Sequence, residues 1–370
     1  MEKIKQYAVI GVFFLFLCGF SVVHFLLPDK DFSPEERKPL AQAPTLTWDT
    51  IRTGDFFSEA ETYLLDQFPL RNRFLDTKRV LDKNIFMMSG SSGYASVGKH
   101  LTQVTPTLNE DQVEHAVKIF NKIIATYPKI NNVYYAVVPD KNYFLTQIKD
   151  QPSLDYDRLF QIAEGIQGEK IDITSLLSLD DYYYTDNHWR QERILPVAEA
   201  LCNAMGVKPA SSDSYHATTL EGFKGMYYTL TESPPEPEEL IYLRNDAIDH
   251  ATVKRLNDAL KIEKMDMYTE ENLDKERTDA YDVYLDGPES MITIENPNAS
   301  SDKHLILIRD SFGSSLAPLL VDSYAKITVL DLRYLKFSMF SAVGIDFTHA
   351  DVLFLFSTST LNNAKALSIY

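Results

Sequence analysis

The sequence has few cysteines and no recognisable cofactor loop. Only Cys18 and Cys202 are present among 370 residues, and Cys18 lies in an apolar N-terminal run. The rest of the chain therefore has one thiol and can form neither an internal disulfide nor a Cys-based zinc site. The eight histidines show no H-x-x-x-H or H-E-x-x-H spacing, and no G-x-x-x-x-G-K or G-x-G-x-x-G loop occurs. We expect no metal and no cofactor.

Acidic residues outnumber basic residues in this sequence. The chain has 36 Lys and Arg against 53 Asp and Glu, a formal net charge of −17. This balance argues against nucleic acid and anionic lipid as partners. Hydrophobic residues make up 45% of the sequence, which is ample for the core of one large α/β domain, with or without insertions.

Charged residues are absent from Tyr7 to Leu27, a run long enough to cross a hydrocarbon core about 30 Å thick. Residues 1–27 are therefore predicted to be an uncleaved transmembrane anchor. A cleaved signal peptide is the alternative, but Ser21 to Asp29 offers no small-x-small cleavage site. A lipoprotein would use Cys18, yet large residues precede that cysteine.

The orientation is predicted more from the bulk of the chain than from the flanking charges. Lys3 and Lys5 precede the run, but Lys30, Arg37 and Lys38 follow it, so the flanks are nearly matched in basic residues. The bulk of the chain follows the run, which favours a single-pass cell-membrane protein with its domain on the extracytoplasmic side. Residues 28–50 carry four prolines among charges and predict an extended stalk. The domain is expected over residues 51–370.

Apolar patterning predicts strands that alternate with helices. Helices are expected at Glu110–Tyr127, Leu159–Gly165, Asn187–Met205 and Phe312–Tyr324, and two more between Asp55 and Met88. Strands are expected at Val133–Val138, Ile171–Ile173, His304–Ile308, Ile327–Leu330 and Asp351–Phe356. This alternation predicts an α/β fold with a mostly parallel, doubly wound sheet.

Residues 231–286 do not follow that rhythm. They carry 16 acidic and 7 basic residues, a net charge of −9, and they begin with a proline-rich stretch. We interpret them as an acidic insertion with short strands at Leu240–Leu243 and Val253–Leu256. The insertion is either a solvated surface excursion or a lid or partner-docking surface.

The segment Arg309-Asp-Ser-Phe-Gly313 joins an apolar strand to a predicted helix. Ser311 would lie at the C-terminal edge of the sheet, where open α/β sheets build their sites and where helix N–H groups can stabilise an oxyanion. The segment only partly resembles a nucleophile elbow, because Arg309 stands where the first glycine is expected. Alternatively, Ser311 or Asp310 caps the helix.

Asp186 and His188 lie two residues apart, just before the predicted helix that ends at Met205. Such a pair can form the second half of a catalytic triad, with His188 as general base for a hydroxyl and Asp186 as its orienting carboxylate. Alternatively, Asp186 or Thr185 caps that helix and His188 is an exposed first-turn residue. Because both segments fall at strand-to-helix junctions, we expect Asp186, His188 and Ser311 to face one another.

The segment Thr185-Asp-Asn-His-Trp189 resembles the signature of the DHHW protein family, which is similar to the alginate O-acetylation proteins and more distantly to SGNH hydrolases. Further segments fit the same resemblance: Lys38-Pro-Leu-Ala41, Gly54-Asp-Phe56, Asp66-Gln-Phe-Pro-Leu-Arg71, Gly222-Phe-Lys-Gly225 and Arg309-Asp-Ser-Phe-Gly313. The resemblance implies an SGNH-hydrolase-like sheet and a triad of Asp186, His188 and Ser311 that moves acetyl groups on or off polysaccharide hydroxyls outside the membrane.

The sequence departs from the family pattern at two places. Asn187 replaces the second residue of the signature, and Ser311 follows Arg-Asp rather than Gly-Asp. The separate oxyanion segments of SGNH enzymes are not identifiable, so Arg309 and Asn362 are candidate oxyanion or substrate residues. Trp189 and the tyrosines at 182–184 are candidates to offer ring faces to a sugar.

We therefore expect a membrane-anchored carbohydrate O-acetyltransferase or acetylesterase that acts on cell-surface polysaccharide. A transferase would need an acetyl donor from a multi-span membrane acyltransferase, because acetyl-CoA is not available outside the membrane. One alternative is a non-catalytic polysaccharide assembly or binding protein with the same fold. Another is a sensor or adhesin that uses the acidic insertion.

Overall fold

The computed structural model describes residues 38–71, 94–145, 153–228, 236–257, 259–273 and 279–367, with shorter stretches among residues 7–33 and 73–77. The chain divides into two compact units, Met1–Ser92 and Gly93–Tyr370. The α/β unit therefore begins near Gly93, later than the predicted start at residue 51.

The N-terminal unit contains two short strands and two helices. Strands β1 (Phe32–Ser33) and β2 (Lys38–Pro39) pair in antiparallel fashion. Helices α2 (Trp48–Thr53) and α3 (Asp55–Asp66) meet at Gly54, whose φ of +89° suits a residue without Cβ. The helix α2 overlaps the last three residues, 48–50, of the predicted stalk.

The predicted membrane anchor at residues 1–27 lies largely outside the described residues. Within the part of the chain that the structure describes, no helix is both long and apolar enough to span a bilayer. The second of the two helices expected between residues 55 and 88 also lies mostly outside the described residues.

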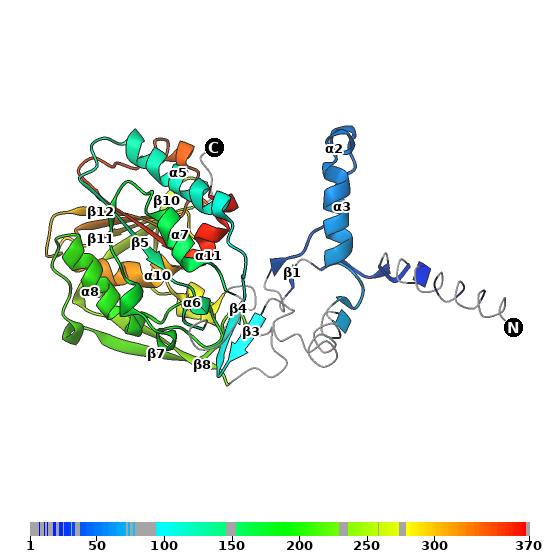
Figure 1. Cartoon of the computed structure of the whole chain (residues 1–370), viewed down its shortest axis with the longest axis horizontal. Coiled ribbons are helices and arrows are strands. Elements are labelled where there is room, and N and C mark those ends of the chain that lie inside the picture. Colours follow the sequence, from blue (N-terminus) through cyan, green and yellow to red (C-terminus); the bar gives the residue numbers. More distant parts are fainter. Residues whose placement is uncertain are drawn as a thin grey trace. The chain divides into compact units, whose positions relative to one another are not determined.

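The α/β unit is built on one eight-stranded sheet, in the order β10-β9-β11-β13-β12-β14-β5-β6 (Figure 1). The parallel strands are β13 (Lys326–Leu330), β12 (His304–Arg309), β14 (Asp351–Ser357), β5 (Asn132–Val138) and β6 (Glu169–Lys170). The strands β11 (Met291–Glu295), β9 (Thr252–Leu256) and β10 (Ile262–Met265) continue the sheet in antiparallel fashion. The predicted mostly parallel α/β sheet is confirmed.

Helices cover both faces of the sheet, as the doubly wound prediction requires. On one face, α5 (Glu110–Thr126), α7 (Tyr156–Ala163) and α11 (Thr358–Asn362) pack on side chains such as Ile306 and Phe354. On the other face, α8 (Leu195–Ala204) and α10 (Phe312–Leu316) pack on Leu305 and Leu353. Figure 1 shows α5 and α8 on opposite sides. Successive side chains of each strand point to opposite faces of the sheet, so each strand contributes to the hydrophobic core on both faces.

Prolines shorten two helices relative to the sequence prediction. Pro196 lies in the first turn of α8. Backbone N–H groups in a first turn have no acceptor within the helix, so proline fits there, whereas it would break the interior of a helix. The helix therefore begins at Leu195 rather than near Asn187. Pro318 similarly separates α10 from a following 3₁₀ turn, η8 (Ala317–Leu320). The residues that precede α8 are consequently free to form an irregular loop.

The acidic segment 231–286 is not only a surface excursion. It supplies β9 and β10 to the main sheet, and β8 (Glu238–Arg244) pairs with β7 (His216–Phe223) in a hairpin. It also supplies the short helix α9 (Asp246–His250) and the 3₁₀ turn η7 (Ala280–Val283). The strands predicted at Leu240–Leu243 and Val253–Leu256 correspond to parts of β8 and β9. The sequence did not predict β10, α9 or η7.

Two small elements complete the unit. Strands β3 (Tyr94–Val97) and β4 (His100–Gln103) form an antiparallel pair that the sequence did not predict. The helix α6 (Lys141–Leu145) follows β5 directly, so it lies at the C-terminal edge of the sheet. This is also the edge from which β12 leads into α10.

Candidate active site

Ser311 lies at the C-terminal edge of the sheet, between β12 and α10. The buried Asp310 carboxylate holds this turn: its Oδ2 accepts hydrogen bonds from the N–H and hydroxyl of Ser357 at 2.8 and 2.7 Å. Its Oδ1 accepts from Phe312 N–H at 3.2 Å. Ser357 ends the neighbouring strand β14, so Asp310 ties two strand ends together. The Ser311 side chain makes no capping bond and is partly exposed.

Asp186 and His188 lie in a narrow loop rather than on the first turn of a helix. Tyr182 and Trp189 pair across its base as an isolated antiparallel bridge. Tyr183 N–H donates to the His188 carbonyl at 3.1 Å. Because Asp186 Oδ1 also accepts the His188 N–H at 2.9 Å, the carboxylate and the imidazole are fixed relative to each other.

A continuous line of hydrogen bonds joins the three side chains. The distance from Asp186 Oδ1 to His188 Nδ1 is 2.6 Å, and that from His188 Nε2 to Ser311 Oγ is 2.7 Å. An ionised carboxylate can only accept, so Nδ1 carries the proton and Nε2 is free to accept one from the serine hydroxyl. This is the geometry that a histidine needs to deprotonate a hydroxyl.

The Asp186 carboxylate is fully buried and must stay ionised to orient the histidine. Burial alone would raise its pKa. The attraction of His188, the hydrogen bond from that ring and the N–H groups of Met226 and His188 outweigh burial and hold the Asp186 pKa below its ordinary value. Met226 N–H donates to Asp186 Oδ2 at 2.8 Å, so both carboxylate oxygens have partners.

Tyr281, from the acidic segment, covers one face of His188. The two rings are stacked, with centroids 3.8 Å apart and an interplanar angle of 6°. The Tyr281 hydroxyl donates to Ser315 Oγ at 2.6 Å, and Trp189 Nε1 donates to the same oxygen at 2.9 Å. The imidazole therefore cannot tilt away from its partners without breaking this packing.

A buried ammonium group organises the loop that carries Asp186. Lys141 is 1% exposed, and the carbonyl oxygens of Leu101, Tyr183, Tyr184 and Asp186 lie 2.5, 2.8, 3.1 and 2.9 Å from its Nζ, so its three N–H groups are shared among four acceptors. Burial lowers the Lys141 pKa to about 7, although the nearby Asp186 and Glu238 carboxylates oppose that shift. The amine thus clamps the loop through its main chain.

Glu238 binds the other polar groups of the same loop. Its carboxylate accepts hydrogen bonds from Tyr184 N–H at 2.6 Å and from both the N–H and the hydroxyl of Thr185 at 2.8 Å. Lys141 satisfies the loop carbonyls and Glu238 satisfies the loop amides. The loop is irregular, but its buried backbone groups have partners.

Gly225 allows the loop to pack closely against residues 222–228. A Cβ at this glycine would lie 2.4 Å from the Thr185 carbonyl oxygen and 2.5 Å from Asp186 Cβ. Gly225 N–H also donates to Thr185 Oγ1 at 3.0 Å. The Gly222-Phe-Lys-Gly225 segment can therefore pack against Thr185 and Asp186 only because residue 225 has no side chain.

Arg309 and Trp189 are buried and do not face a substrate, contrary to our expectation. Arg309 is 1% exposed and pairs with Asp331 at 3.2 Å, while its stem packs where a Cβ of Gly313 would be. Trp189 is fully buried. Tyr182 and Tyr183 are buried as well, so of the four rings expected to contact sugar only Tyr184 is partly exposed.

Asn362 is used in a structural contact at the end of α11. Its Oδ1 accepts from Asn109 N–H at 2.7 Å and its Nδ2 donates to the Thr107 carbonyl at 3.1 Å. These bonds fix the start of α5, so the structure gives no support to Asn362 as an oxyanion donor. The backbone N–H of Ser311 is the remaining candidate from the sequence.

Sequence reasoning missed Lys141, Glu238 and Tyr281. Lys141 carried a signal, because Pro139-Asp140-Lys141 directly follows a buried strand at the edge where the other site residues were expected. Glu238 and Tyr281 lie in the acidic segment, where nothing in the local pattern separates them from solvated residues.

The chain was compared with known proteins and structures. The DHHW protein family matches residues 175–330. The structure resembles a DHHW family protein from Eubacterium siraeum with a TM-score of 0.60 and 22% identity, over 74% of this chain and 93% of that chain. It also resembles Bacillus cereus PatB1, solved with a sulfonyl adduct, with a TM-score of 0.59 and 17% identity, over 72% and 95% of the respective chains.

A more distant likeness is to the O-acetyltransferase domain of Pseudomonas putida AlgJ, with a TM-score of 0.44 and 13% identity over 73% of this chain and 92% of that chain. No curated protein matches the sequence significantly. The first two structures share the fold of the α/β unit. Residues 175–330, which include Asp186, His188 and Ser311, match the DHHW protein family, and the resemblance predicted from Thr185–Trp189 is confirmed.

Proposed function

We propose that this protein is a carbohydrate O-acetyltransferase or acetylesterase that acts on extracytoplasmic polysaccharide through a covalent acetyl-Ser311 intermediate. One observation carries the proposal: the unbroken line of short hydrogen bonds from Asp186 through His188 to the Ser311 hydroxyl. Its members come from two segments 123 residues apart in sequence, and the hydroxyl at its end is partly exposed.

In the first half-reaction, Ser311 Oγ attacks the acetyl carbonyl carbon while His188 Nε2 takes the hydroxyl proton. The tetrahedral intermediate then collapses. The bond to the leaving oxygen breaks, the imidazolium gives that oxygen its proton, and the acetyl group stays on Ser311. Asp186 stabilises the imidazolium, which is why a carboxylate with a depressed pKa suits the position.

In the second half-reaction, His188 takes a proton from the acceptor and the acceptor oxygen attacks acetyl-Ser311. A sugar hydroxyl as acceptor gives transfer, and water gives hydrolysis. The Ser311 oxygen leaves and recovers its proton from the imidazolium. In this mechanism the Ser311 backbone N–H, at the start of α10, donates to the developing oxyanion.

The main rival is a non-catalytic binding protein with the same fold. Such a protein has no need for a serine within reach of a histidine, and a separation of more than about 4 Å would have favoured it. The distance of 2.7 Å between Ser311 Oγ and His188 Nε2 supports catalysis instead.

Covalent trapping tests the nucleophile without knowledge of the polymer. An aryl sulfonyl fluoride is expected to modify the protein at a single site, because Ser311 Oγ attacks sulfur, fluoride leaves and His188 takes the proton. PatB1 has been solved with a sulfonyl adduct, which motivates this probe. Intact-mass and peptide mass spectrometry should find one sulfonyl group on Ser311.

The matched control is His188→Ala, which keeps Ser311 but removes its base. Labelling of this variant should be at least about 100-fold slower than that of the wild type. Equal labelling of the two proteins, or a sulfonyl group on any other residue, would show that Ser311 is not an activated nucleophile.

We further propose that residues 1–27 anchor the chain in the cell membrane, with the α/β unit outside. The support is the uncharged run from Tyr7 to Leu27. For a transferase, the acetyl group would come from a multi-span membrane acyltransferase. The full chain should sediment with membranes and resist carbonate extraction, and a chain without residues 1–27 should not. Release of the full chain by carbonate would exclude the anchor.

A further inference from the structure

A groove of about 610 Å³ lies at the C-terminal edge of β5 and β6. Two kinds of side chain line it. The helices α6 and α7 supply the aromatic rings of Tyr143, Phe144 and Phe160, and residues 170–179 supply polar groups and aliphatic side chains. This volume falls in the ordinary range of roughly 300–1,000 Å³ for ligand pockets.

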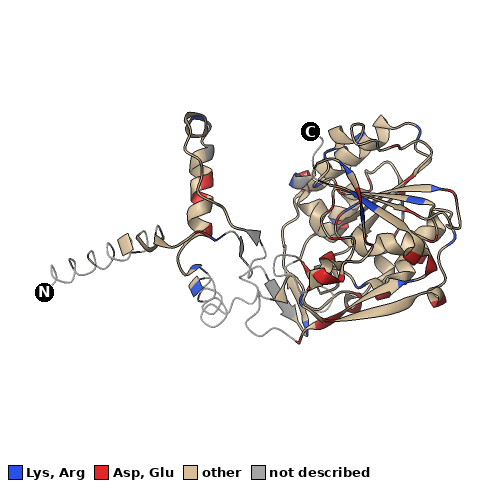
Figure 2. Cartoon of the chain, turned by 180° about the vertical axis from the view of Figure 1, so that it is seen from behind, with Lys and Arg blue, Asp and Glu red and all other residues tan. Residues whose placement is uncertain are grey.

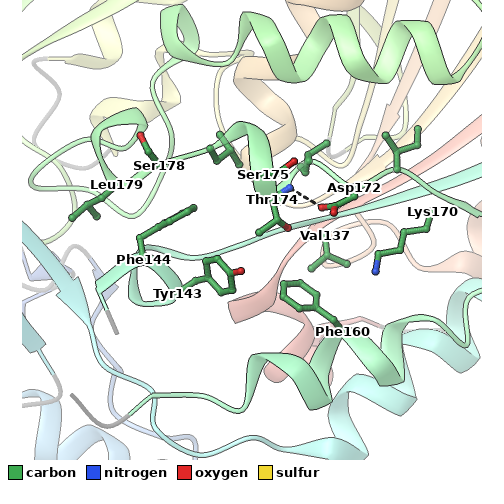
Figure 3. A pocket seen from close by; sticks show the side chains of 13 residues that line it. Val137, Tyr143, Phe144, Phe160, Lys170, Asp172, Thr174, Ser175, Ser178 and Leu179 are labelled. Carbon is green, nitrogen blue, oxygen red and sulfur yellow. Dashed lines mark hydrogen bonds between the residues drawn. The ribbon is translucent and has the colours of Figure 1, made fainter. Parts of the chain in front are cut away.

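The rings and the polar groups form opposite walls. Figure 3 shows Tyr143, Phe144 and Phe160 along one side and Thr174, Ser175 and Ser178 along the other. The polar wall is ordered by its own contacts, since Asp172 Oδ1 accepts the Thr174 N–H at 2.9 Å. Tyr143 and Phe160 are partly exposed, with ring centroids 6.1 Å apart in an edge-to-face contact.

This pairing of walls matches the chemistry of a sugar ring. A pyranose presents apolar C–H faces, which pack on aromatic rings, and a rim of hydroxyls, which need donors and acceptors. A purely apolar ligand would leave the hydroxyls of Thr174 and Ser175 without ligand partners. The Ser178 hydroxyl already donates to Asp181 Oδ2 at 2.9 Å. A small anion would gain nothing from the rings.

The groove and Ser311 share one edge of the sheet. From β12, which leads to Ser311, the neighbouring strands are β14, β5 and β6, so the groove begins about 10–14 Å away at ordinary strand spacing. The helix α6 contributes to both places: Lys141 clamps the Asp186 loop, while Tyr143 and Phe144 line the groove. The chain also runs directly from Ser178 in the groove to Asp186 in the site.

We propose that the groove is an extended subsite for an oligosaccharide chain of neutral or N-acetylated hexoses, which it holds while another unit of the same chain lies at Ser311. This deepens the proposed function and rests on it for the identity of the reacting unit. Asp and Glu outnumber Lys and Arg and recur along the unit's ribbon in Figure 2, which disfavours a polyanionic chain.

The test measures binding, not turnover, on the Ser311→Ala protein by isothermal titration calorimetry. Chitohexaose and cellohexaose are the two probes, and N-acetylglucosamine is the single-unit comparison. We expect at least one hexamer to bind at least tenfold more tightly than the monosaccharide, because the groove and the site hold several units together. Phe160→Ala should weaken hexamer binding roughly five- to tenfold through loss of one ring face.

The matched control is Phe337→Ala. Phe337 is also partly buried and makes an edge-to-face ring contact, with Tyr127, but it is outside the groove. This variant should bind the hexamer like the parent. Failure of both hexamers to bind, or equal weakening by the two substitutions, would overturn the subsite. Because no turnover is involved, these results are independent of whether Ser311 proves to be the nucleophile.

Discussion

Ser311→Ala should lower kcat for an acetylated chromogenic ester by at least about 10³-fold while the protein stays folded. The substitution removes the atom that we propose as the nucleophile, and in serine hydrolases such a loss leaves only the rate enhancement from binding and oxyanion stabilisation. KM should change much less, because the Ser311 side chain is small and partly exposed. Steady-state kinetics on the purified α/β unit, Gly93–Tyr370, and on the full chain would measure both parameters.

Two comparisons make this result specific. Ser314→Ala removes a buried hydroxyl from the same short helix and should leave kcat within a few-fold of the wild type. Asp186→Asn keeps the shape of the carboxylate but disfavours the required His188 tautomer, so a loss of roughly 10²–10⁴-fold is expected. If Ser311→Ala retained full activity with an unchanged melting temperature, the nucleophile would have to be another residue.

Lys141→Met should lower the free energy of unfolding by about 3 kcal/mol or more. The substitution keeps an unbranched apolar stem but removes the Nζ donor that four carbonyls share. The Tyr184 carbonyl keeps a hydrogen bond from Leu101 N–H at 2.7 Å, but each buried carbonyl left unsatisfied costs about 1–3 kcal/mol. It also removes a cation close to the Asp186 and Glu238 carboxylates. Urea unfolding at neutral pH would measure the difference. We also expect kcat to fall, since Asp186 loses one of the bonds that position it.

The pH dependence of this difference follows from the depressed Lys141 pKa. Between about pH 7 and the ordinary lysine value of 10.5, the unfolded chain holds a proton on this amine that the folded protein does not. Stability rises with pH wherever the unfolded state binds more protons. The wild type should therefore gain stability relative to Lys141→Met as pH rises through this window.

Lys118→Met is the control for that experiment. The Lys118 side chain is 73% exposed and pairs with the half-exposed Glu114 at 3.3 Å on the surface of α5, so its loss should cost less than about 1 kcal/mol. It should also leave the pH dependence unchanged. A Lys141→Met protein with wild-type stability at all pH values would show that the buried amine does not hold the loop.

The parallel core could be predicted from sequence because its strands are continuously apolar. The strands β12, β13 and β14 lie within one residue of their expected bounds, and α5 ends one residue early. Because the loops that follow parallel strands meet at one edge of the sheet, Ser311 and the loop of Asp186 could be predicted to lie at the same edge before any side-chain contact was known. That rule is why residues far apart in sequence could be expected to face one another.

What could not be predicted depends on contacts between distant segments. From the sequence alone, Trp189 could either contact a sugar or belong to the hydrophobic core. Its contacts with Phe312 and Ser315 show that it belongs to the core. Tyr281 lies in a segment of high negative charge, yet its ring packs on His188. The sequence around His188 gives no information about which distant aromatic residue will pack on its ring.

The clamp formed by Lys141 and Glu238 has a consequence for sequence variation. Except for the Thr185 hydroxyl, every loop atom that it binds belongs to the main chain. The path of the loop is therefore specified without the side chains of Tyr184 and Asn187, which are both partly exposed. These two positions can change identity while Asp186 and His188 keep their places, and this explains how an asparagine fits at the second position of the signature.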